Sequence, residues 1–128
     1  MNNKLINHLK ELLIKNNYLD LYTFLDVILY DKQFGFYNSI NRKKNELIGK
    51  EGHFITAPEI SQLFGELVGI WILQLCRENH FHNINLLELG PGKGTLMRDI
   101  LRFFSQQKEN IKIKIHLLEF SKVLKSYQ

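Results

Sequence analysis

The chain contains almost no cysteine and no long hydrophobic run. A single cysteine, Cys76, occurs among its 128 residues, so no disulfide can form within the chain, and a secreted fold held by disulfides is not indicated. No stretch approaches the roughly 18 uninterrupted apolar residues of a membrane helix, so we expect no membrane span. The N-terminus has neither the apolar core of a signal peptide nor the early arginine of a transit peptide. Together these absences predict a cytoplasmic protein.

Basic residues exceed acidic residues, but they are dispersed along the chain. The formal net charge is +4, and the one tight cluster, Arg42-Lys43-Lys44, lies in a stretch without apolar periodicity, which indicates a solvated loop. Nucleic-acid binding rewards concentrated Lys and Arg, so we expect no nucleic-acid partner. His80 and His82 lie two residues apart without cysteine or acidic partners at ligand spacing, so no metal site is predicted.

Residues 1–80 are expected to form a helical and loop region. Apolar residues recur at helical spacing over 3–16 and again over about 21–30, which predicts two amphipathic helices. Between 31 and 55 the periodicity is absent, and turn-forming residues indicate a long connection. Its aromatic residues either cover a pocket or pin the loop to the core, and the sequence leaves both interpretations open. These residues are Phe34, Phe36, Tyr37 and Phe54.

A further helix is predicted to begin at Thr56 and to run to about residue 76. Thr56 stands three residues before Glu59, with Pro58 in the first turn, which is the arrangement of a capping box. Glycine is unfavourable inside a helix, so we expect a neighbouring backbone to approach closely where two glycines lie one turn apart. These are Gly65 and Gly69.

Residues 81–128 predict one strand–helix–strand unit. A short apolar run over 84–89 suits a strand buried on both faces, as in a parallel sheet. A glycine loop follows, then an amphipathic helix over 95–107 and a second strand-like run over 111–120. The spacing predicts a βαβ unit with parallel strands. Ser121 is placed to cap another helix.

Three glycines, Gly90, Gly92 and Gly94, lie where the first strand turns into the helix. A phosphate-binding P-loop is excluded, because Gly92-Lys93 is followed by glycine instead of serine or threonine. A dinucleotide fingerprint is weakened but not excluded, because Thr95 stands where glycine or alanine is preferred. The remaining pattern is acid-x-Gly-x-Gly-x-Gly, which is typical of S-adenosylmethionine-binding loops.

Acidic residues stand at the ends of both predicted strands. Glu88 precedes the glycine loop, where a carboxylate attracts the ammonium and sulfonium of S-adenosylmethionine and repels a pyrophosphate. Glu119 ends the second strand, where an acid accepts hydrogen bonds from ribose hydroxyls in both cofactor classes. Glu119 therefore indicates a nucleoside, and Glu88 favours S-adenosylmethionine.

Three ordered blocks carry a resemblance to a known family. They are "FITAPEISQLFGELVGIW", "LLELGPGKGTLMRDILRFF" and "IHLLEFS". With these blocks the chain resembles the MidA family, the methyltransferases related to the mitochondrial complex I assembly arginine methyltransferase. The resemblance implies an α/β class: a partial Rossmann-like class I methyltransferase fold, with N-terminal helices over 1–80 and the first βαβ unit, truncated, over 81–128.

The resemblance also implies a cofactor, an acceptor and a set of site residues. The cofactor is S-adenosyl-L-methionine, and the acceptor is a protein arginine of a respiratory complex I subunit. The residues expected to bind the cofactor are Glu88, Gly90, Pro91, Gly92, Gly94, Thr95 and Glu119. Thr56, Pro58, Glu59 and Ser61 are expected near the site. No catalytic residue is assigned, and the family's Gly-Asp-Phe is replaced here by Gly52-His53-Phe54.

Two strands are fewer than the seven of a class I methyltransferase sheet, and three interpretations stay open. The chain is a working part completed by a separately encoded C-terminal half, an inactive truncated remnant, or a nucleotide-binding or assembly module that transfers no methyl group. A two-stranded unit alone is marginal, because both outer edges are unpaired.

Overall fold

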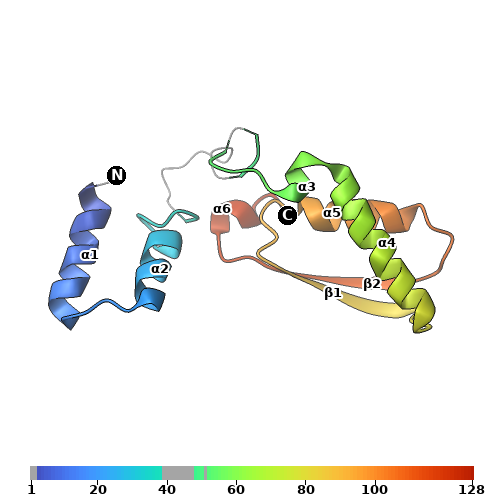
Figure 1. Cartoon of the computed structure of the whole chain (residues 1–128), viewed down its shortest axis with the longest axis horizontal. Helices are drawn as coiled ribbons and strands as arrows, with labels where there is room; N and C mark the ends of the chain where they lie inside the picture. The colour runs from blue at the N-terminus through green and yellow to red at the C-terminus, as the bar shows by residue number, and fades with distance from the viewer. Residues whose placement is uncertain (1–2, 39–47, 51) are drawn as a thin grey trace.

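The computed structural model describes residues 3–38, 48–50 and 52–128, so the basic cluster Arg42-Lys43-Lys44 lies outside the described residues. The elements are α1 (Asn3–Asn16), α2 (Leu21–Tyr30), α3 (Ala57–Ile60), α4 (Gln62–Glu78), β1 (Asn83–Leu89), α5 (Thr95–Ser105), β2 (Lys112–Leu118) and α6 (Lys122–Lys125). Helices α1 and α2 lie together at one end of the molecule, and the later elements gather around the two strands (Figure 1). No helix in the described ranges is long and apolar enough to cross a membrane.

The first two helices form where the apolar periodicity predicts them. Helix α2 begins after Asp20, whose carboxylate accepts a hydrogen bond from the Thr23 amide at 2.9 Å and so satisfies a donor at the helix start. Beyond the helix, the Asp31 carboxylate accepts from the Phe34 amide at 2.9 Å and turns the chain. The turn places the Phe34 ring 5.8 Å from the ring of His8 on α1.

The third predicted helix is divided in two at Ser61. This residue has an extended backbone (φ −150°, ψ 129°), and its hydroxyl accepts from the Leu63 amide at 3.2 Å, so Ser61 caps α4. Thr56 is the N-cap of α3 but makes no side-chain capping bond. The capping box predicted from Thr56 and Glu59 is therefore wrong, because the Glu59 carboxylate bonds to Thr95 instead.

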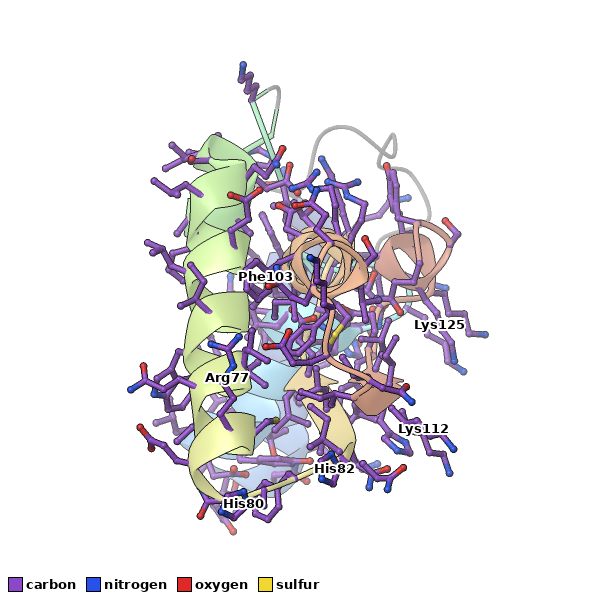
Figure 2. The ribbon with its side chains drawn as sticks, turned by 90° about the vertical axis from the view of Figure 1, so that its right-hand side faces the viewer. Arg77, His80, His82, Phe103, Lys112 and Lys125 are labelled. Carbon is purple, nitrogen blue, oxygen red and sulfur yellow. The ribbon has the colours of Figure 1, made fainter. Side chains whose placement is uncertain are left out.

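The two glycines of α4 lie against α5, and the predicted close backbone approach is found at Gly65. A Cβ on Gly65 would lie 2.5 Å from the Cβ of Asp99 and 3.4 Å from the carbonyl oxygen of Leu96. A Cβ on Gly69 would lie 2.7 Å from the ring of Phe103, which is a side-chain contact instead of a backbone one, and Phe103 projects between the two helices in Figure 2. Glycine is required here because the helices pack without room for a side chain.

Buried apolar side chains reinforce this helix pair. Leu73 and Cys76 of α4 are each 3% exposed, and Met97 and Ile100 of α5 are nearly as buried. Cys76 is thus a small buried residue. Helix α4 precedes residue 80 in the sequence and packs on α5, which follows it. The proposed boundary between regions 1–80 and 81–128 therefore does not coincide with a gap in the packing.

Strands β1 and β2 pair in parallel, in register from Asn83 with Lys112 to Leu89 with Leu118. Burial alternates along β1, and Leu87 and Leu89 are 62% and 69% exposed. The prediction that β1 is buried on both faces is therefore wrong for this chain. Its apolar residues match a strand between two layers, but the described elements cover only one face.

The short helix α6 closes the carboxyl edge of the sheet. Ser121 is fully buried and caps α6 by accepting from the Leu124 amide at 3.2 Å, which confirms the predicted cap. Its hydroxyl also donates to the Tyr37 carbonyl, 84 positions earlier. Leu124 packs against Ile48, and these two residues hold a cluster of partly buried side chains. The cluster contains Phe36, Tyr37, Val123 and Tyr127.

The close approach of α4 and α5 is tested by Gly65→Ala. Alanine is the better helix former, but its methyl group would overlap Asp99, so we expect a loss of about 1–3 kcal/mol in the free energy of unfolding. Urea denaturation measures this change. Gln74→Ala, on the exposed side of α4, is the control and should change stability by about 0.5 kcal/mol or less. Equal stability of Gly65→Ala and the wild-type chain would contradict the packing.

Candidate cofactor-binding site

The loop between β1 and α5 is built on left-handed glycines. Gly90, Gly92 and Gly94 have φ values of +66°, +57° and +73°. Residues that carry a Cβ atom rarely adopt this left-handed conformation. Space is not the constraint: a Cβ on Gly90 would meet nothing within 4 Å, and one on Gly92 would only touch Ile48 at 3.4 Å. The backbone conformation alone therefore explains why the sequence has glycine at these places.

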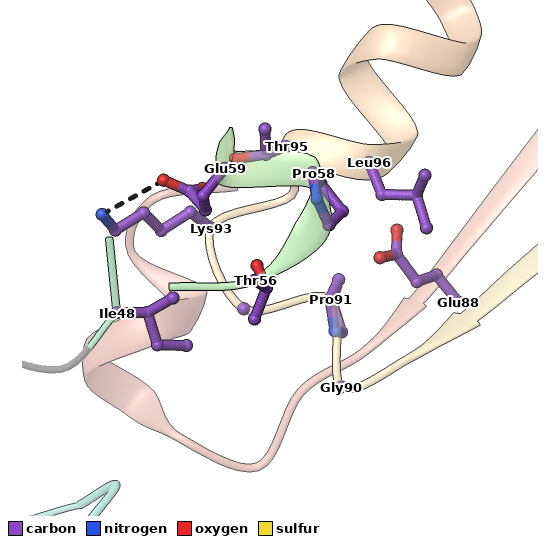
Figure 3. A pocket seen from close by; sticks show the side chains of 11 residues that line it. Ile48, Thr56, Pro58, Glu59, Glu88, Gly90, Pro91, Lys93, Thr95 and Leu96 are labelled. Atoms are coloured by element: carbon purple, nitrogen blue, oxygen red, sulfur yellow. Dashed lines mark hydrogen bonds and ion pairs between the residues drawn. The ribbon is translucent and has the colours of Figure 1, made fainter. Parts of the chain in front are cut away.

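A pocket opens over this loop, between β1, the start of α5 and helix α3 (Figure 3). The end of β1 contributes Glu88, and the loop contributes Gly90 and Gly92 together with Pro91 and Lys93. Helix α3 approaches from the other side. The lining residues are Ile48, Thr56, Pro58, Glu59, Glu88, Gly90, Pro91, Gly92, Lys93, Thr95 and Leu96.

Glu88 brings an unsatisfied carboxylate oxygen to this pocket. Its Oε2 atom is buried and has no hydrogen-bond partner. Burial raises the pKa of Glu88 above its ordinary value of 4.5, and a backbone hydrogen bond from Met97 opposes the rise. A buried carboxylate oxygen without a partner is unfavourable. It becomes favourable when a cationic donor binds beside it, so this end of the pocket suits an ammonium group.

Glu119 joins the end of β2 to the glycine loop. Its Oε2 atom accepts from the Gly92 amide at 3.1 Å, and its Oε1 atom accepts from the Ser121 amide at 2.8 Å. Each carboxylate oxygen has a second lone pair. The acid can therefore hold the loop and still accept hydrogen bonds from a ligand hydroxyl.

A second pocket adjoins the first across Ile48, Thr56, Gly90 and Gly92, which line both. Glu119 lies in it beside aromatic side chains from the N-terminal half of the chain. Its remaining lining residues are Tyr30, Tyr37, Phe54 and Leu124. Burial raises the pKa of Tyr37, and the nearby Tyr30 and Glu119 raise it further. The two pockets together form an elongated site along the glycine loop, with an acid near each end.

The aromatic residues of the 31–55 loop therefore divide between the two roles that the sequence left open. Tyr37 and Phe54 line the second pocket. Phe36 packs on the cluster around Leu124 and pins the segment. The exposed His53 lies 5.5 Å from the Phe36 ring and lines neither pocket described above.

The structure brings together most of the residues that the sequence singles out. Of the block near the site, Thr56, Pro58 and Glu59 line the first pocket, whereas Ser61 lies outside it as the cap of α4. Gly94 lies outside both pockets as the N-cap of α5. The sequence reasoning missed three residues that line the first pocket, Ile48, Lys93 and Leu96. Lys93 was visible within the glycine motif, but Ile48 follows a stretch without periodicity and gives no sequence signal.

A strand, a left-handed glycine loop and a helix, with acids at the ends of two parallel strands, define the class I methyltransferase type of site. A family model described as a putative S-adenosyl-L-methionine-dependent methyltransferase matches residues 67–128. This part of the chain is therefore similar to a methyltransferase family, as the resemblance predicted.

Relatives of the chain are named protein arginine methyltransferases. The chain is 42% identical over 106 residues to the mitochondrial NDUFAF7 homolog of Drosophila melanogaster, an alignment that covers 82% of this chain and 23% of the fly protein. It is 38% identical over 132 residues to mitochondrial NDUFAF7 of Danio rerio, covering all of this chain and 30% of the fish protein. The chain thus spans between a fifth and a third of these relatives.

A solved structure shares the fold. It is a likely methyl transferase from Burkholderia thailandensis bound to S-adenosyl-homocysteine, with a TM-score of 0.73 and 19% identity. The match covers 98% of this chain and 33% of that one. The α/β, Rossmann-like fold predicted from the sequence is therefore confirmed, and the described elements correspond to about a third of that solved structure.

The relatives correct one prediction. They are named mitochondrial, so the expected cytoplasmic location is wrong. The absence of disulfides indicated a reducing compartment, but it does not distinguish the cytoplasm from other reducing compartments.

The loop conformation is tested by two substitutions at Gly92. Gly92→Val places a β-branched residue at φ +57°, and we expect a loss of about 1–3 kcal/mol in the free energy of unfolding. Gly92→Asn is the matched variant, because asparagine enters the left-handed region more readily, and its loss should be smaller. Urea denaturation of both variants measures the difference. Equal losses would show that the backbone conformation is not the constraint.

Proposed function

We propose that this chain forms the cofactor-binding part of an S-adenosylmethionine-dependent protein arginine methyltransferase. The acceptor class follows from the names of the relatives, NDUFAF7 protein arginine methyltransferases. A subunit of respiratory complex I is the acceptor that the family resemblance implies. The observation that carries the proposal is the buried, unpartnered oxygen of Glu88 beside a left-handed glycine loop.

The donor set fits an elongated cationic nucleoside. Glu88 would bind the ammonium of the methionine moiety, and Gly90, Pro91 and Gly92 would place the backbone beside the ligand. Glu119 would accept from the ribose hydroxyls, with Tyr37 as part of an apolar wall around the nucleoside. A pyrophosphate would be repelled by the Glu88 carboxylate, which argues against a dinucleotide.

When bound, S-adenosylmethionine supplies an activated methyl group on a sulfonium. Transfer to a nitrogen nucleophile is an in-line displacement, so the protein contributes by orienting the ligand and excluding water. Glu88 would hold the ammonium and Glu119 the ribose hydroxyls, and the loop between them would set the position of the ligand along the pocket. Thr95, the first residue of α5, holds the loop end through its bond to Glu59.

Ligand binding by the 128-residue chain is measured by isothermal calorimetry with S-adenosylmethionine and S-adenosylhomocysteine. Both ligands should bind, and Glu88→Gln should weaken both by about tenfold or more, since each loses a charge-assisted hydrogen bond to its ammonium. Glu11→Gln on the exposed side of α1 is the control for removal of a carboxylate and should leave affinity unchanged. A folded wild-type chain that binds neither ligand would refute the proposal.

Methyl transfer is a separate question from binding. Incubating the chain with S-adenosylmethionine and arginine-containing peptides of complex I subunits measures release of S-adenosylhomocysteine. Acceptor-dependent release would support a methyltransferase that works as this chain stands. Binding without release would favour a nucleotide-binding module, or a part that requires a separately encoded partner.

The raised pKa of Glu88 predicts a pH dependence of both binding and stability. Only the ionised carboxylate attracts the ligand ammonium, so affinity should fall as pH drops through the raised pKa, which lies above 4.5. The folded-state pKa exceeds the unfolded one, so protonation stabilises the fold at low pH, and this contribution is lost as pH rises through the folded pKa. Glu88→Gln should therefore remove the pH dependence and be more stable than the wild-type chain at pH 7. Calorimetry and thermal unfolding at several pH values, with Glu11→Gln as control, test both signs.

A further inference from the structure

Helix α3 reaches the glycine loop through one carboxylate. The Oε1 atom of Glu59 accepts from the Thr95 hydroxyl, and its Oε2 atom lies 3.7 Å from Nζ of Lys93. Figure 3 shows the Glu59 and Lys93 side chains meeting at one side of the pocket. Lys93 and Thr95 flank Gly94, so a single side chain from outside the loop holds the residues before and after it.

This contact replaces a cap that α5 does not have. Gly94 is the N-cap of α5 in the left-handed conformation and has no side chain to accept a bond from the helix start. Because Thr95 is the first residue of α5, its bond to Glu59 fixes the start of the helix relative to α3. Glycine at position 94 permits the turn but cannot cap the helix. Glu59 supplies the constraint that a capping side chain would otherwise have provided.

The ion pair is shielded from solvent. The side chains of Lys93 and Glu59 are 23% and 18% exposed, so their attraction is screened less than that of an exposed pair. Gly49 lies directly over them: a Cβ at that position would be 2.7 Å from Nζ of Lys93 and 3.3 Å from Oε2 of Glu59. Because residue 49 is a glycine, the Lys93 ammonium has space beside the Glu59 carboxylate.

The charge of Lys93 matters because it lines the same pocket as Glu88. An unpaired ammonium there would repel a cationic ligand and would compete for the Glu88 carboxylate. Paired with Glu59, the ammonium adds no net charge to the pocket. The carboxylate of Glu88 is then the unpaired charge among the charged residues that line it.

From these contacts we infer that Glu59 is a positioning residue that anchors the glycine loop and neutralises Lys93, so that the pocket favours a cationic over a neutral ligand. The inference rests on the proposed function and specifies how this chain distinguishes two cofactor states. S-adenosylmethionine has a sulfonium and one net positive charge, whereas S-adenosylhomocysteine is neutral overall. Glu59 therefore favours binding of the methyl donor, S-adenosylmethionine, over binding of the product, S-adenosylhomocysteine.

The experiment measures the ratio of the dissociation constants for the two ligands by calorimetry on the 128-residue chain. Glu59→Gln leaves Lys93 unpaired and should weaken S-adenosylmethionine about tenfold more than S-adenosylhomocysteine, as expected for one uncompensated charge in a partly shielded site. Lys93→Met leaves Glu59 unpaired and should shift the ratio in the opposite direction. The double variant Glu59→Gln/Lys93→Met should return the ratio close to its wild-type value. Lys10→Met on α1 removes the same charge far from the pocket and is the control.

A merely structural role would weaken both ligands equally. An unchanged ratio in Glu59→Gln, or a double variant that fails to restore it, overturns the inference. If Glu59→Gln does not fold, Lys93→Met alone decides, because an unchanged ratio in that variant also overturns it. A wild-type chain that binds both ligands while the variants keep its ratio refutes this inference only. A wild-type chain that binds neither refutes the proposed function as well.

Discussion

The hydrogen bond from the Gly92 amide to the Glu119 carboxylate is the constraint on which the rest of the site depends. The carboxyl ends of two parallel strands meet at one edge of a sheet, and this bond connects the loop after β1 to the end of β2 at that edge. It requires a left-handed backbone at Gly92, which glycine alone adopts without strain. The two pockets exist because the loop is held open in this conformation between two acids.

Three carboxylates meet the loop, and their different partners give them different roles. Glu119 is satisfied by two backbone amides, and Glu59 by Thr95 and Lys93, so both acids mainly hold structure. Only Glu88 keeps a buried oxygen without a partner, and burial raises its pKa. Of the three acids, Glu88 is therefore the one that the proposed function assigns to the ligand ammonium, because Glu119 and Glu59 are already bonded to groups of the protein.

Local patterns in the sequence predicted most of the fold, and the failures have one cause. Helical periodicity placed α1 and α2, and the glycine motif placed the turn between β1 and α5. The capping box at Thr56 failed because Glu59 finds Thr95, 36 positions away, and no local pattern reports a contact of that range. Burial of β1 failed for the same reason: the apolar run is a local property, whereas burial depends on the packing of other elements, and Leu87 is 62% exposed. For the candidate site, the glycines and acids were visible in the sequence, but Ile48 was not.

The aromatic residues that line the second pocket show that the βαβ unit alone does not form the site. Tyr37 and Phe54 come from the N-terminal half, and the second pocket would lack one side without them. Ser121 holds the backbone of Tyr37, because its hydroxyl donates to the Tyr37 carbonyl while it caps α6 two residues after Glu119. Glu119 and Tyr37, which line the second pocket, are thus both held by one short segment. A change in the packing of α2 would move this side of the pocket, because the Tyr37 amide donates to the Leu29 carbonyl of α2, which lies outside the strand–helix–strand unit that carries the glycine motif.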